Sequence, residues 1–390
     1  MLTREENETL TRVDRGTPGG ELLRRYWQPV AAAGELTEEK PIKAIKLLGE
    51  ELVVYRDKRG RYGLVGEQCS HRKASLAFGR VDDEGIRCPY HGWKYDNTGK
   101  CLEQPAEPDS AGFKDKIKHT AYPVEKLGGL LWAYLGPEPR ALLPRWDVLA
   151  WENGKRWIEK HEIYNCNWLQ PMENSVDPSH LYWLHGETAH LVGVVERYEE
   201  EHNFIPFEFG ILKQRRTPGR KPGDGPQLDQ HPLVFPNTLR HVFRALKTDG
   251  LLHHNMQIRV PVDDTHTQIF VVYFTPTEPD FSPADGDTPW EYFPIRDENG
   301  QYRLEHVLVQ DAMAWETQGP ITDRTQEHLG VGDEGIIFFR KLLREQIDIV
   351  RHGGEPLGVI RDPNKNKIIE FPVINERIGI YGKQQPQMVA

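Results

Sequence analysis

The chain has 390 residues, of which 38% are hydrophobic and 28% are charged, and its formal net charge at pH 7 is −10. At roughly 100–200 residues per domain this length predicts two or three domains, and the composition is typical of a folded globular protein. The acidic balance disfavours nucleic acid as a partner, and the lack of a membrane-length apolar stretch or an apolar signal segment disfavours a membrane and favours the cytoplasm.

The first third of the chain predicts a small β domain. We expect a short, mainly helical lead-in over residues 1–41. After it, short strand-like runs alternate with turns that contain Gly and Asp, which predicts an antiparallel β domain over residues 42–136. The Pro-rich segment 136–144 is typical of a linker.

The rest of the chain, residues 137–390, predicts a larger domain of the α+β class. A helical stretch is expected over about 166–185, followed by several long strands and by two closing helices near 303–317 and 334–352. Strands and helices that come in blocks, rather than in strict alternation, favour this class.

Two pairs of Cys and His stand in the predicted β domain. Cys69 and His71 form a Cys-X-His pair, and Cys88 and His91 form a Cys-X-X-His pair. Thiolates suit ferric iron, and neutral imidazoles reduce the negative charge on their own iron, which raises the potential of a 2Fe-2S cluster. Zinc is the alternative metal for this ligand set, but a zinc finger usually has Cys-X-X-Cys on a hairpin and its His pair on a helix. We therefore expect a 2Fe-2S cluster here.

A second group of candidate ligands lies in the predicted helical stretch. His180 and His185 are five residues apart, which in a regular helix separates them by about 140° around the axis. Both can reach one metal only if the helix is distorted, as by a π-bulge, or ends between them. Two His need a carboxylate to complete the facial triad of a non-haem iron, which leaves positions open for O2. Our candidate is Asp311, because an unpaired carboxylate among its apolar helical neighbours would be costly.

Asp177 and Pro178 precede this His pair and predict a helix start. Asp is a favoured N-cap and Pro is favoured at the first helical position. Taken alone, Asp177 needs no role beyond capping, and a His pair at this spacing is more often structural than metal-binding. The upstream Cys and His pairs shift the balance toward a metal site.

Together the two motifs resemble those of the catalytic α subunit of Rieske non-haem iron oxygenases. The segment CSHRKASLAFGRVDDEGIRCPYHGW is similar to the Rieske cluster motif, and Asp177, His180 and His185 match the family pattern Asp-X-X-His-X-X-X-X-His. GTPGGELLRRYWQP and QGPITDRTQEHLGVGDEGI resemble the phthalate dioxygenase-like branch. The resemblance implies a Rieske β domain followed by a helix-grip (START-like) catalytic domain, with a 2Fe-2S Rieske cluster, a mononuclear Fe(II) and O2 as co-substrate.

The resemblance also implies partners and residue roles. Subunits of the family form head-to-tail trimers or stacked trimers, in which the cluster of one subunit faces the iron of its neighbour. By position, Asp177 resembles the carboxylate that bridges His91 of one subunit and His180 of the next, which would fix both imidazole tautomers, and Asn174 resembles a residue beside the iron. The chain has no nucleotide-binding fingerprint and no plant-type cluster motif, so we expect a separate NADH-dependent reductase, with or without a ferredoxin.

The expected reaction is hydroxylation or O-demethylation of a small aromatic carboxylate by a terminal oxygenase. An Arg fork suits a carboxylate, although an ion-paired or solvated sheet face is the commoner role of a single Arg. The Arg residues expected near the pocket are Arg215, Arg216, Arg220, Arg240 and Arg244, of which we take Arg216, Arg240 and Arg244 as candidates for substrate binding. We expect only packing roles for His231, His253 and His254.

Two other functions stay open at this point. A Rieske oxygenase could act on a non-aromatic substrate, by N-demethylation or C–H hydroxylation, and a quaternary amine or an alkaloid would favour an aromatic cage over Arg. A Rieske electron carrier is the alternative from a different class. A carrier has no reason to possess His180, His185 and Asp311, so these residues distinguish the two classes.

Overall fold

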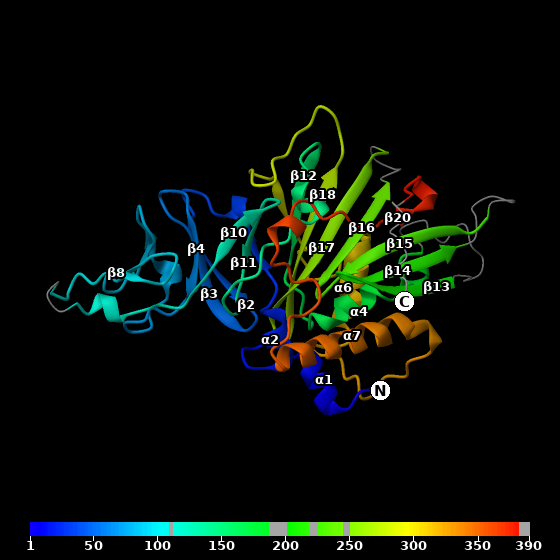
Figure 1. Cartoon of the computed structure of the whole chain (residues 1–390), viewed down its shortest axis with the longest axis horizontal. Helices are drawn as coiled ribbons and strands as arrows, with labels where there is room; N and C mark the ends of the chain where they lie inside the picture. Colours follow the sequence, from blue (N-terminus) through cyan, green and yellow to red (C-terminus); the bar gives the residue numbers. More distant parts are fainter. Residues whose placement is uncertain (109–111, 187–200, 218–224, 245–249, 382–390) are drawn as a thin grey trace.

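The computed structural model describes residues 1–108, 112–186, 201–217, 225–244 and 250–381. Figure 1 shows an elongated molecule, with a small lobe of short strands at one end and a larger lobe built on one broad sheet at the other. Within these ranges, no helix combines the length and the apolar character needed to cross a bilayer.

Two short helices open the chain: α1 (Arg4–Thr11) and α2 (Pro18–Leu23). Each follows a Thr whose hydroxyl accepts a backbone N–H of the first turn, which satisfies one donor that a helix start leaves free. Next comes a strand, β1 (Gln28–Ala32), where the sequence predicts only a helical lead-in. It pairs with β11 (Leu130–Ala133), which also pairs with β10 (Val124–Leu127). The partner of β1 lies far along the chain, so no local pattern indicates this strand.

The small lobe contains two four-stranded antiparallel sheets, with the orders β2-β3-β4-β9 and β5-β6-β7-β8. Their strands are β2 (Ile42–Leu47), β3 (Glu50–Arg56), β4 (Tyr62–Gly66), β5 (Arg80–Val81), β6 (Ile86–Arg87), β7 (Lys94–Tyr95), β8 (Cys101–Glu103) and β9 (Ala121–Tyr122). Side chains from both sheets meet in one buried core, which includes Cys69 and Cys88. The small antiparallel β fold predicted from the sequence is confirmed.

The large lobe is built on a nine-stranded sheet with the order β13-β14-β15-β16-β17-β18-β12-β19, in which β20 pairs with β15. The strands are β12 (Lys155–His161), β13 (Glu201–Phe207), β14 (Gly210–Thr217), β15 (Gln227–Val234), β16 (Thr238–Arg244), β17 (Leu252–Asp263), β18 (His266–Thr275), β19 (Trp290–Phe293) and β20 (Ile374–Asn375). All neighbours are antiparallel except β12 and β19. The long strands predicted after the helical stretch are therefore confirmed.

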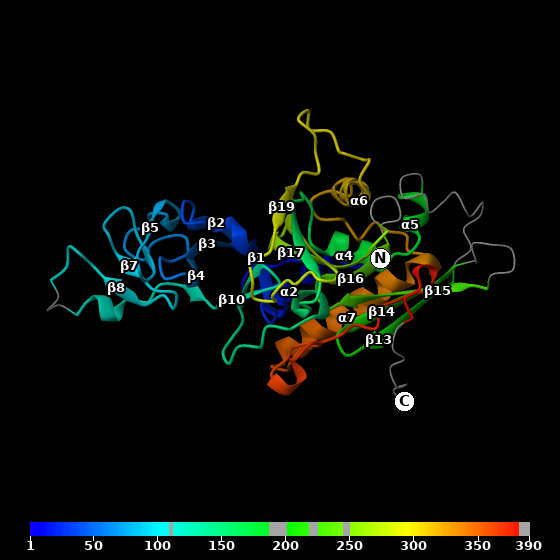
Figure 2. The same ribbon diagram turned by 90° about the horizontal axis from the view of Figure 1, so that it is seen from above.

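Helices cover both faces of this sheet. They are α3 (Asp147–Ala150), α4 (Leu169–Ser175), α5 (His180–Trp183), α6 (Val307–Glu316) and α7 (Glu334–Arg351). Figure 2 shows α6 and α7 on opposite sides of the strands. Val309 of α6 shares a core with Val271, whereas Phe339 of α7 shares a core with Val272. Consecutive residues of a strand point to opposite faces, so the packing agrees with the picture and with the predicted α+β class.

The helix predicted over 166–185 is interrupted. α4 ends at Ser175, and α5 begins only at His180. Asp177 lies in the break, where its Oδ1 accepts from the backbone N–H and the hydroxyl of Ser179 at 2.8 and 2.6 Å. The prediction that a helix begins at Pro178 with Asp177 as its N-cap is therefore wrong, because Asp177 closes a turn that precedes the helix.

A buried ion cluster fixes α4 to α7. The carboxylate of Glu173 on α4 accepts from Arg324 at 2.9 and 2.7 Å and from Arg340 on α7 at 2.6 Å. All three side chains are almost fully buried. Burial alone would raise the pKa of Glu173, but the two guanidinium groups outweigh it and hold this pKa below its usual value. The cluster thereby sets the direction in which the chain leaves α4.

Glu173→Ala should lower the free energy of unfolding by about 3–5 kcal/mol, because it leaves the buried guanidinium group of Arg324 without a carboxylate among the described residues and leaves Arg340 with Glu327 alone. Urea denaturation followed by circular dichroism measures the change. Glu8→Ala is the matched control: it removes an exposed pair with Arg4, which should cost less than about 1 kcal/mol. A loss in Glu173→Ala no larger than in the control would contradict a stabilising role for the cluster.

Candidate metal centres

Two loops of the small lobe, after β4 and after β6, present the Cys and His pairs with the same backbone geometry. In each loop the N–H of the Cys donates to the carbonyl five residues later, and the N–H four residues later donates back to the carbonyl of the Cys. The fourth residues after Cys69 and Cys88 are Lys73 and Gly92, which both have positive φ, at 63° and 78°. Gly adopts this conformation easily, whereas Lys does so at some cost. The two loops are thus held in one shape by main-chain bonds.

These loops place two thiols inside and two imidazoles outside. Cys69 and Cys88 belong to the buried core of the small lobe, whereas the half-buried rings of His71 and His91 have centroids 4.5 Å apart. The ring of His71 stacks on Trp93 at 4.5 Å, and its buried Nδ1 has no hydrogen-bond partner among the described residues. A buried nitrogen normally has a partner, so a free Nδ1 beside a thiol pair fits iron ligation by two Cys and two His.

Tyr95 also belongs to this site, although the sequence analysis missed it. Its buried hydroxyl lies 3.1 Å from Sγ of Cys69. Burial raises the pKa of Tyr95 far above its usual value, with a contribution from the hydrogen bond to Cys69, so the hydroxyl keeps its proton. When Cys69 is a thiolate, Tyr95 is therefore the donor. Hydrogen bonds to the sulfurs are one of the factors that set the potential of an iron–sulfur cluster.

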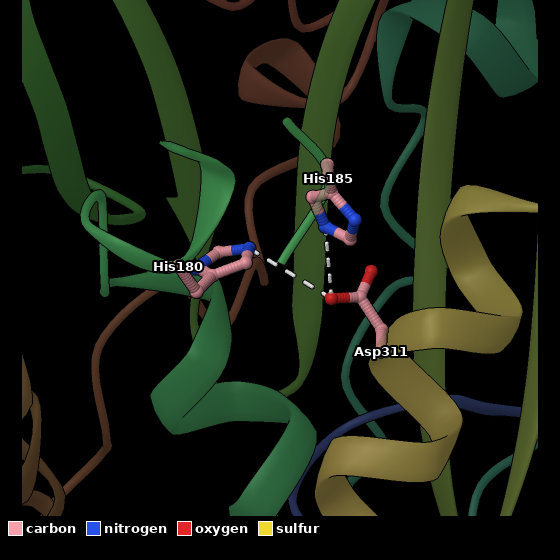
Figure 3. Close-up of side chains that lie close together, drawn as sticks. All are labelled: His180, His185 and Asp311. Atoms are coloured by element: carbon pink, nitrogen blue, oxygen red, sulfur yellow. Dashed lines mark ion pairs between the residues drawn. The ribbon is translucent and has the colours of Figure 1, made fainter. Parts of the chain in front are cut away.

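His180, His185 and Asp311 converge in the large lobe (Figure 3), where their side chains point toward one another from α5, from the turn after it and from α6. The Nε2 atoms of His180 and His185 lie 3.8 and 3.1 Å from the same atom, Oδ1 of Asp311. One ligand atom from each residue fits within 4.8 Å of the others. α5 ends at Trp183, between the two His, so no π-bulge is needed to bring the rings together.

Packing between α4 and α6 holds the carboxylate in place. Asp311 is buried, and its Oδ1 accepts from Nδ2 of Asn174 on α4 at 3.3 Å. One turn earlier, Nε2 of Gln170 donates to the carbonyls of Trp315 and Gly319 at 2.8 and 2.9 Å. Gln170 thereby ties α4 to the C-terminal end of α6. The sequence prediction had placed Asn174 near this centre, and the geometry places it in contact with Asp311.

Gln310 orients the second imidazole, and the sequence analysis missed it as well. Oε1 of Gln310 lies 2.9 Å from Nδ1 of His185, and Nε2 of Gln310 donates to the carbonyl of Leu304 at 2.9 Å. A backbone carbonyl can only accept, so the amide nitrogen faces Leu304 and the amide oxygen faces His185. Nδ1 of His185 therefore carries a proton, and in the neutral ring the lone pair is on Nε2, the atom nearest Asp311.

The two imidazoles have shifted pKa values. Burial lowers the pKa of His180, and the charge of Lys213 adds to the effect, so this ring is neutral at physiological pH. Burial opposes the charged form of His185 too, but the hydrogen bond and charge of Asp311 outweigh it and raise the pKa of His185. A bound cation would take the place of the proton that Nε2 of His185 carries in the charged ring. Two imidazoles and one carboxylate on adjoining elements therefore fit a mononuclear non-haem iron.

Asp177 lies on the other side of His180. Its Oδ2 is 3.8 Å from Nδ1 of His180, and this buried nitrogen has no hydrogen-bond partner in the described part of the chain. The carboxylate therefore faces the ring without a direct bond. Nε2 of His180 is directed at the point where the other two ligands meet.

The Arg candidates for substrate binding are engaged or exposed. Arg240 is 1% exposed and donates to both carboxylate oxygens of Asp147 on α3 at 3.0–3.2 Å, so it fits the alternative of an ion-paired sheet face. Arg244 donates to the backbone carbonyls of residues 250 and 378. Arg216 is exposed, and Arg220 falls outside the described residues. The geometry lends none of these candidates support as a substrate ligand.

The His residues expected to have only packing roles are engaged in the sheet. Nδ1 of His253 lies 2.6 Å from the hydroxyl of Thr275, and Nδ1 of His254 accepts from Arg240 at 2.8 Å. His231 faces Asp229, with Nε2 and Oδ1 3.0 Å apart.

Known structures share this fold. Caffeine-bound NdmA QL mutant of Pseudomonas putida CBB5 superposes with a TM-score of 0.66 at 24% identity, covering 85% of this chain and 93% of that one. Dicamba monooxygenase bound to dicamba gives a TM-score of 0.62 at 16% identity, covering 84% and 98%. The sequence profile of the Rieske 2Fe-2S domain matches residues 26–121, and a profile described as LigXa C-terminal domain like matches residues 297–378.

Sequence relatives cover nearly the whole chain. It is 39% identical to the 5,5'-dehydrodivanillate O-demethylase oxygenase subunit of Sphingobium sp. strain SYK-6, over 96% of this chain and 87% of that subunit. It is 31% identical to the phthalate 4,5-dioxygenase oxygenase subunit of Pseudomonas putida, over 96% and 92%. It is 34% identical to the phenoxybenzoate dioxygenase subunit alpha of Ectopseudomonas oleovorans, over 90% and 87%.

The fold, the domain match and these relatives agree on one class of enzyme, the oxygenases that contain a Rieske domain. The chain belongs to the Rieske non-haem iron oxygenases, as a catalytic α subunit of the phthalate dioxygenase-like branch. Its cofactors are a Rieske 2Fe-2S cluster and a mononuclear iron, and O2 is its co-substrate. The family, the enzyme class and the cofactors expected from the sequence are confirmed.

Tyr95→Phe should lower the reduction potential of the cluster without removing the cluster, because the variant loses a hydrogen bond that favours the more negative, reduced state. A redox titration followed by visible absorption measures the potential. Tyr55→Phe is the matched control, since Tyr55 lies in the same core and its hydroxyl has no hydrogen-bond partner among the described residues. An unchanged potential in Tyr95→Phe would rule out an electrostatic effect of this hydroxyl.

Gln310→Leu should weaken the affinity of the mononuclear site for Fe(II) by roughly 10–100-fold, because His185 loses the acceptor that fixes its tautomer. Cluster iron and acid-labile sulfide should stay at the wild-type level. Fe(II) titration of protein depleted of its mononuclear iron measures the affinity. Gln318→Leu is the control, because Gln318 is exposed beyond the end of α6, where its side chain bonds the Ala314 carbonyl and the Thr322 hydroxyl and none of the proposed iron ligands. The role of Gln310 would be refuted if both variants bound iron as tightly as wild type.

Proposed function

We propose that this oxygenase hydroxylates or O-demethylates an aromatic carboxylate, using electrons from a separate NADH-dependent reductase, with or without a ferredoxin. One observation carries the proposal: the large lobe brings two imidazoles and a carboxylate together in a chain whose relatives above 30% identity include three enzymes named for aromatic acids. Those names refer to 5,5'-dehydrodivanillate, phthalate and phenoxybenzoate.

In this proposal the two centres have separate tasks. Cys69, His71, Cys88 and His91 hold the cluster, and His180, His185 and Asp311 hold the iron. The cluster supplies single electrons and the iron supplies the activation of O2 when both are bound. Gln310 fixes the donor atom of His185, and Asn174 keeps Oδ1 of Asp311 in place. The domains are the lead-in 1–41, the Rieske domain 42–136 and the catalytic domain 137–390.

The distance between the two centres within one chain supports a head-to-tail trimer. In Figure 2 the strands β5, β7 and β8 lie at one end of the molecule, whereas α5 and α6 lie apart from them in the large lobe. This separation would favour electron transfer between neighbouring copies over transfer within one chain once the cluster and the iron are bound. His91 is half-buried and accessible on the small lobe, and Asp177 faces His180 in the large lobe. We assign Asp177 as the bridge between His91 of one copy and His180 of the next.

A second candidate function has one specific observation in its favour. The chain is 33% identical to the tert-butanol monooxygenase / tert-amyl alcohol desaturase oxygenase subunit of Aquincola tertiaricarbonis, over 87% of this chain and 76% of that subunit. This relative keeps C–H hydroxylation of a non-aromatic substrate as the alternative. An electron carrier is disfavoured, because the convergence of His180, His185 and Asp311 has no use in one.

Chemically reduced protein should convert at least one aromatic acid in a single turnover with O2, without any reductase. Mass spectrometry of phthalate, 3-phenoxybenzoate and 5,5'-dehydrodivanillate after mixing separates two added oxygens, one added oxygen and loss of a methyl group with release of formaldehyde. Asp311→Ala is the control: it should keep the visible absorption of the cluster and give no product. Conversion of tert-butanol but of no acid would replace the proposal by the second candidate.

A further inference from the structure

A row of directly opposed side chains crosses the sheet on the face that α6 covers. From β14 to β12, its members are Lys213, His231, His241, Asn255, Tyr273 and Trp157. Directly opposed residues of antiparallel strands share a face, and the His231 and His241 rings are in contact, with centroids 4.2 Å apart. Tyr273 packs in the same core as Val309 of α6. The whole row therefore faces the layer that carries Asp311.

Lys213 stands at one end of this row as a buried cation. Its side chain is 6% exposed, and it makes no hydrogen bond or ion pair with any residue that the structure describes. The neighbouring Asp229 is already engaged, since it accepts from Arg215 at 2.6 Å and faces His231. An ammonium group in this setting is costly unless a partner reaches it. A buried charge without a partner near a metal centre is a candidate for ligand binding.

The charge of Lys213 is present at neutral pH and acts on the iron site. Burial lowers the pKa of Lys213 to about 8, with repulsion from Arg215 as a further cause, so most molecules carry the charge at pH 7. The same charge contributes to the lowered pKa of His180. Lys213 therefore lies within electrostatic reach of the proposed iron ligands, unlike Arg240, which is bound to Asp147 on α3.

Along the row, the character of the surface changes from charged to aromatic. Next to Lys213, Nε2 of His231 faces Oδ1 of Asp229 at 3.0 Å. Three strands from Lys213, the buried Oδ1 of Asn255 has no hydrogen-bond partner within the described ranges. At the far end, Tyr273 and Trp157 stack with centroids 4.7 Å apart and planes 7° from parallel. The row thus offers a charge for a carboxylate at one end, polar groups in its middle and aromatic surface at the other end.

We propose that Lys213 binds the carboxylate of the substrate and that the rest of the acid extends along the row from His231 toward Trp157. This assignment rests on the proposed function and makes Lys213 a specificity-determining residue. A carboxylate supplies a charge partner that the described residues do not provide. Acids are thereby selected over neutral analogues of the same shape, because a neutral group would leave the ammonium unpaired.

The test compares acids with their primary amides on the holoenzyme, with both iron centres loaded and reduced under anaerobic conditions. The probes are phthalate, 3-phenoxybenzoate, 5,5'-dehydrodivanillate and the amides of all three, and calorimetric titration gives each Kd. Lys213→Met removes the charge at similar length, and Lys213→Arg keeps the charge. Lys155→Met is the control, because Lys155 lies on the same sheet with a side chain that is 69% exposed.

Wild type and Lys155→Met should bind at least one acid more tightly than its amide. Lys213→Met should weaken binding of that acid by about 30-fold or more and leave amide binding unchanged, whereas Lys213→Arg should retain the preference for the acid. Iron content and melting temperature establish that each variant is folded. If Lys213→Met does not fold, Lys213→Gln takes its place.

Two results would overturn the assignment, and they differ in what they say of the proposed function. Equal binding of the preferred acid by wild type and by Lys213→Met would exclude Lys213 as the carboxylate site and leave the aromatic-acid oxygenase intact. If wild type instead bound no acid at millimolar concentration, or bound acids and amides equally, the substrate class itself would be wrong.

Discussion

The packing of α4 against α6 is the constraint on which the chemistry of the large lobe depends. Asn174 and Asp311, which meet at the site, are 137 residues apart in the chain, and the two His of the same site follow α4 directly. Ordering a chain segment of that length has an entropic cost, which is offset by burial of α6 and by the hydrogen bonds of Gln170. Glu173 ties α4 to α7 as well. Three distant segments are thereby held in one geometry.

The two metal centres are built on different physical principles. In the small lobe, short loops fix Cys69 and Cys88 through main-chain hydrogen bonds, so the local sequence carries most of the information. In the large lobe, the proposed ligands come from α5, the turn after it and α6, and neighbouring side chains such as Gln310 set their orientation. The first site is therefore robust to changes outside its loops, whereas the second depends on helix packing throughout the lobe.

This difference explains what the sequence could predict. The cluster loops, most strands and the two closing helices follow from local patterns. Helix geometry required either a distortion or a helix end between His180 and His185, and the structure has the helix end. β1 could not be foreseen, because its partner is remote in sequence. The roles of Gln310 and Lys213 depend on side-chain contacts and on strand register, which no spacing rule encodes. The pairing of Arg240 with Asp147, which removes Arg240 as a substrate ligand, is likewise a contact between distant segments.

The row from Lys213 to Trp157 also has a length. It spans six adjacent strands, hence five strand spacings, which at about 4.8 Å each amounts to roughly 24 Å. Because a sheet is stiff in this direction, each member of the row lies at a fixed distance from the Lys213 ammonium. When an acid is held there by its carboxylate, the carbon that faces Asp311 is set by its distance from that end. The carbon atom that reacts would then be determined by its distance from the carboxylate and not by the other substituents of the ring.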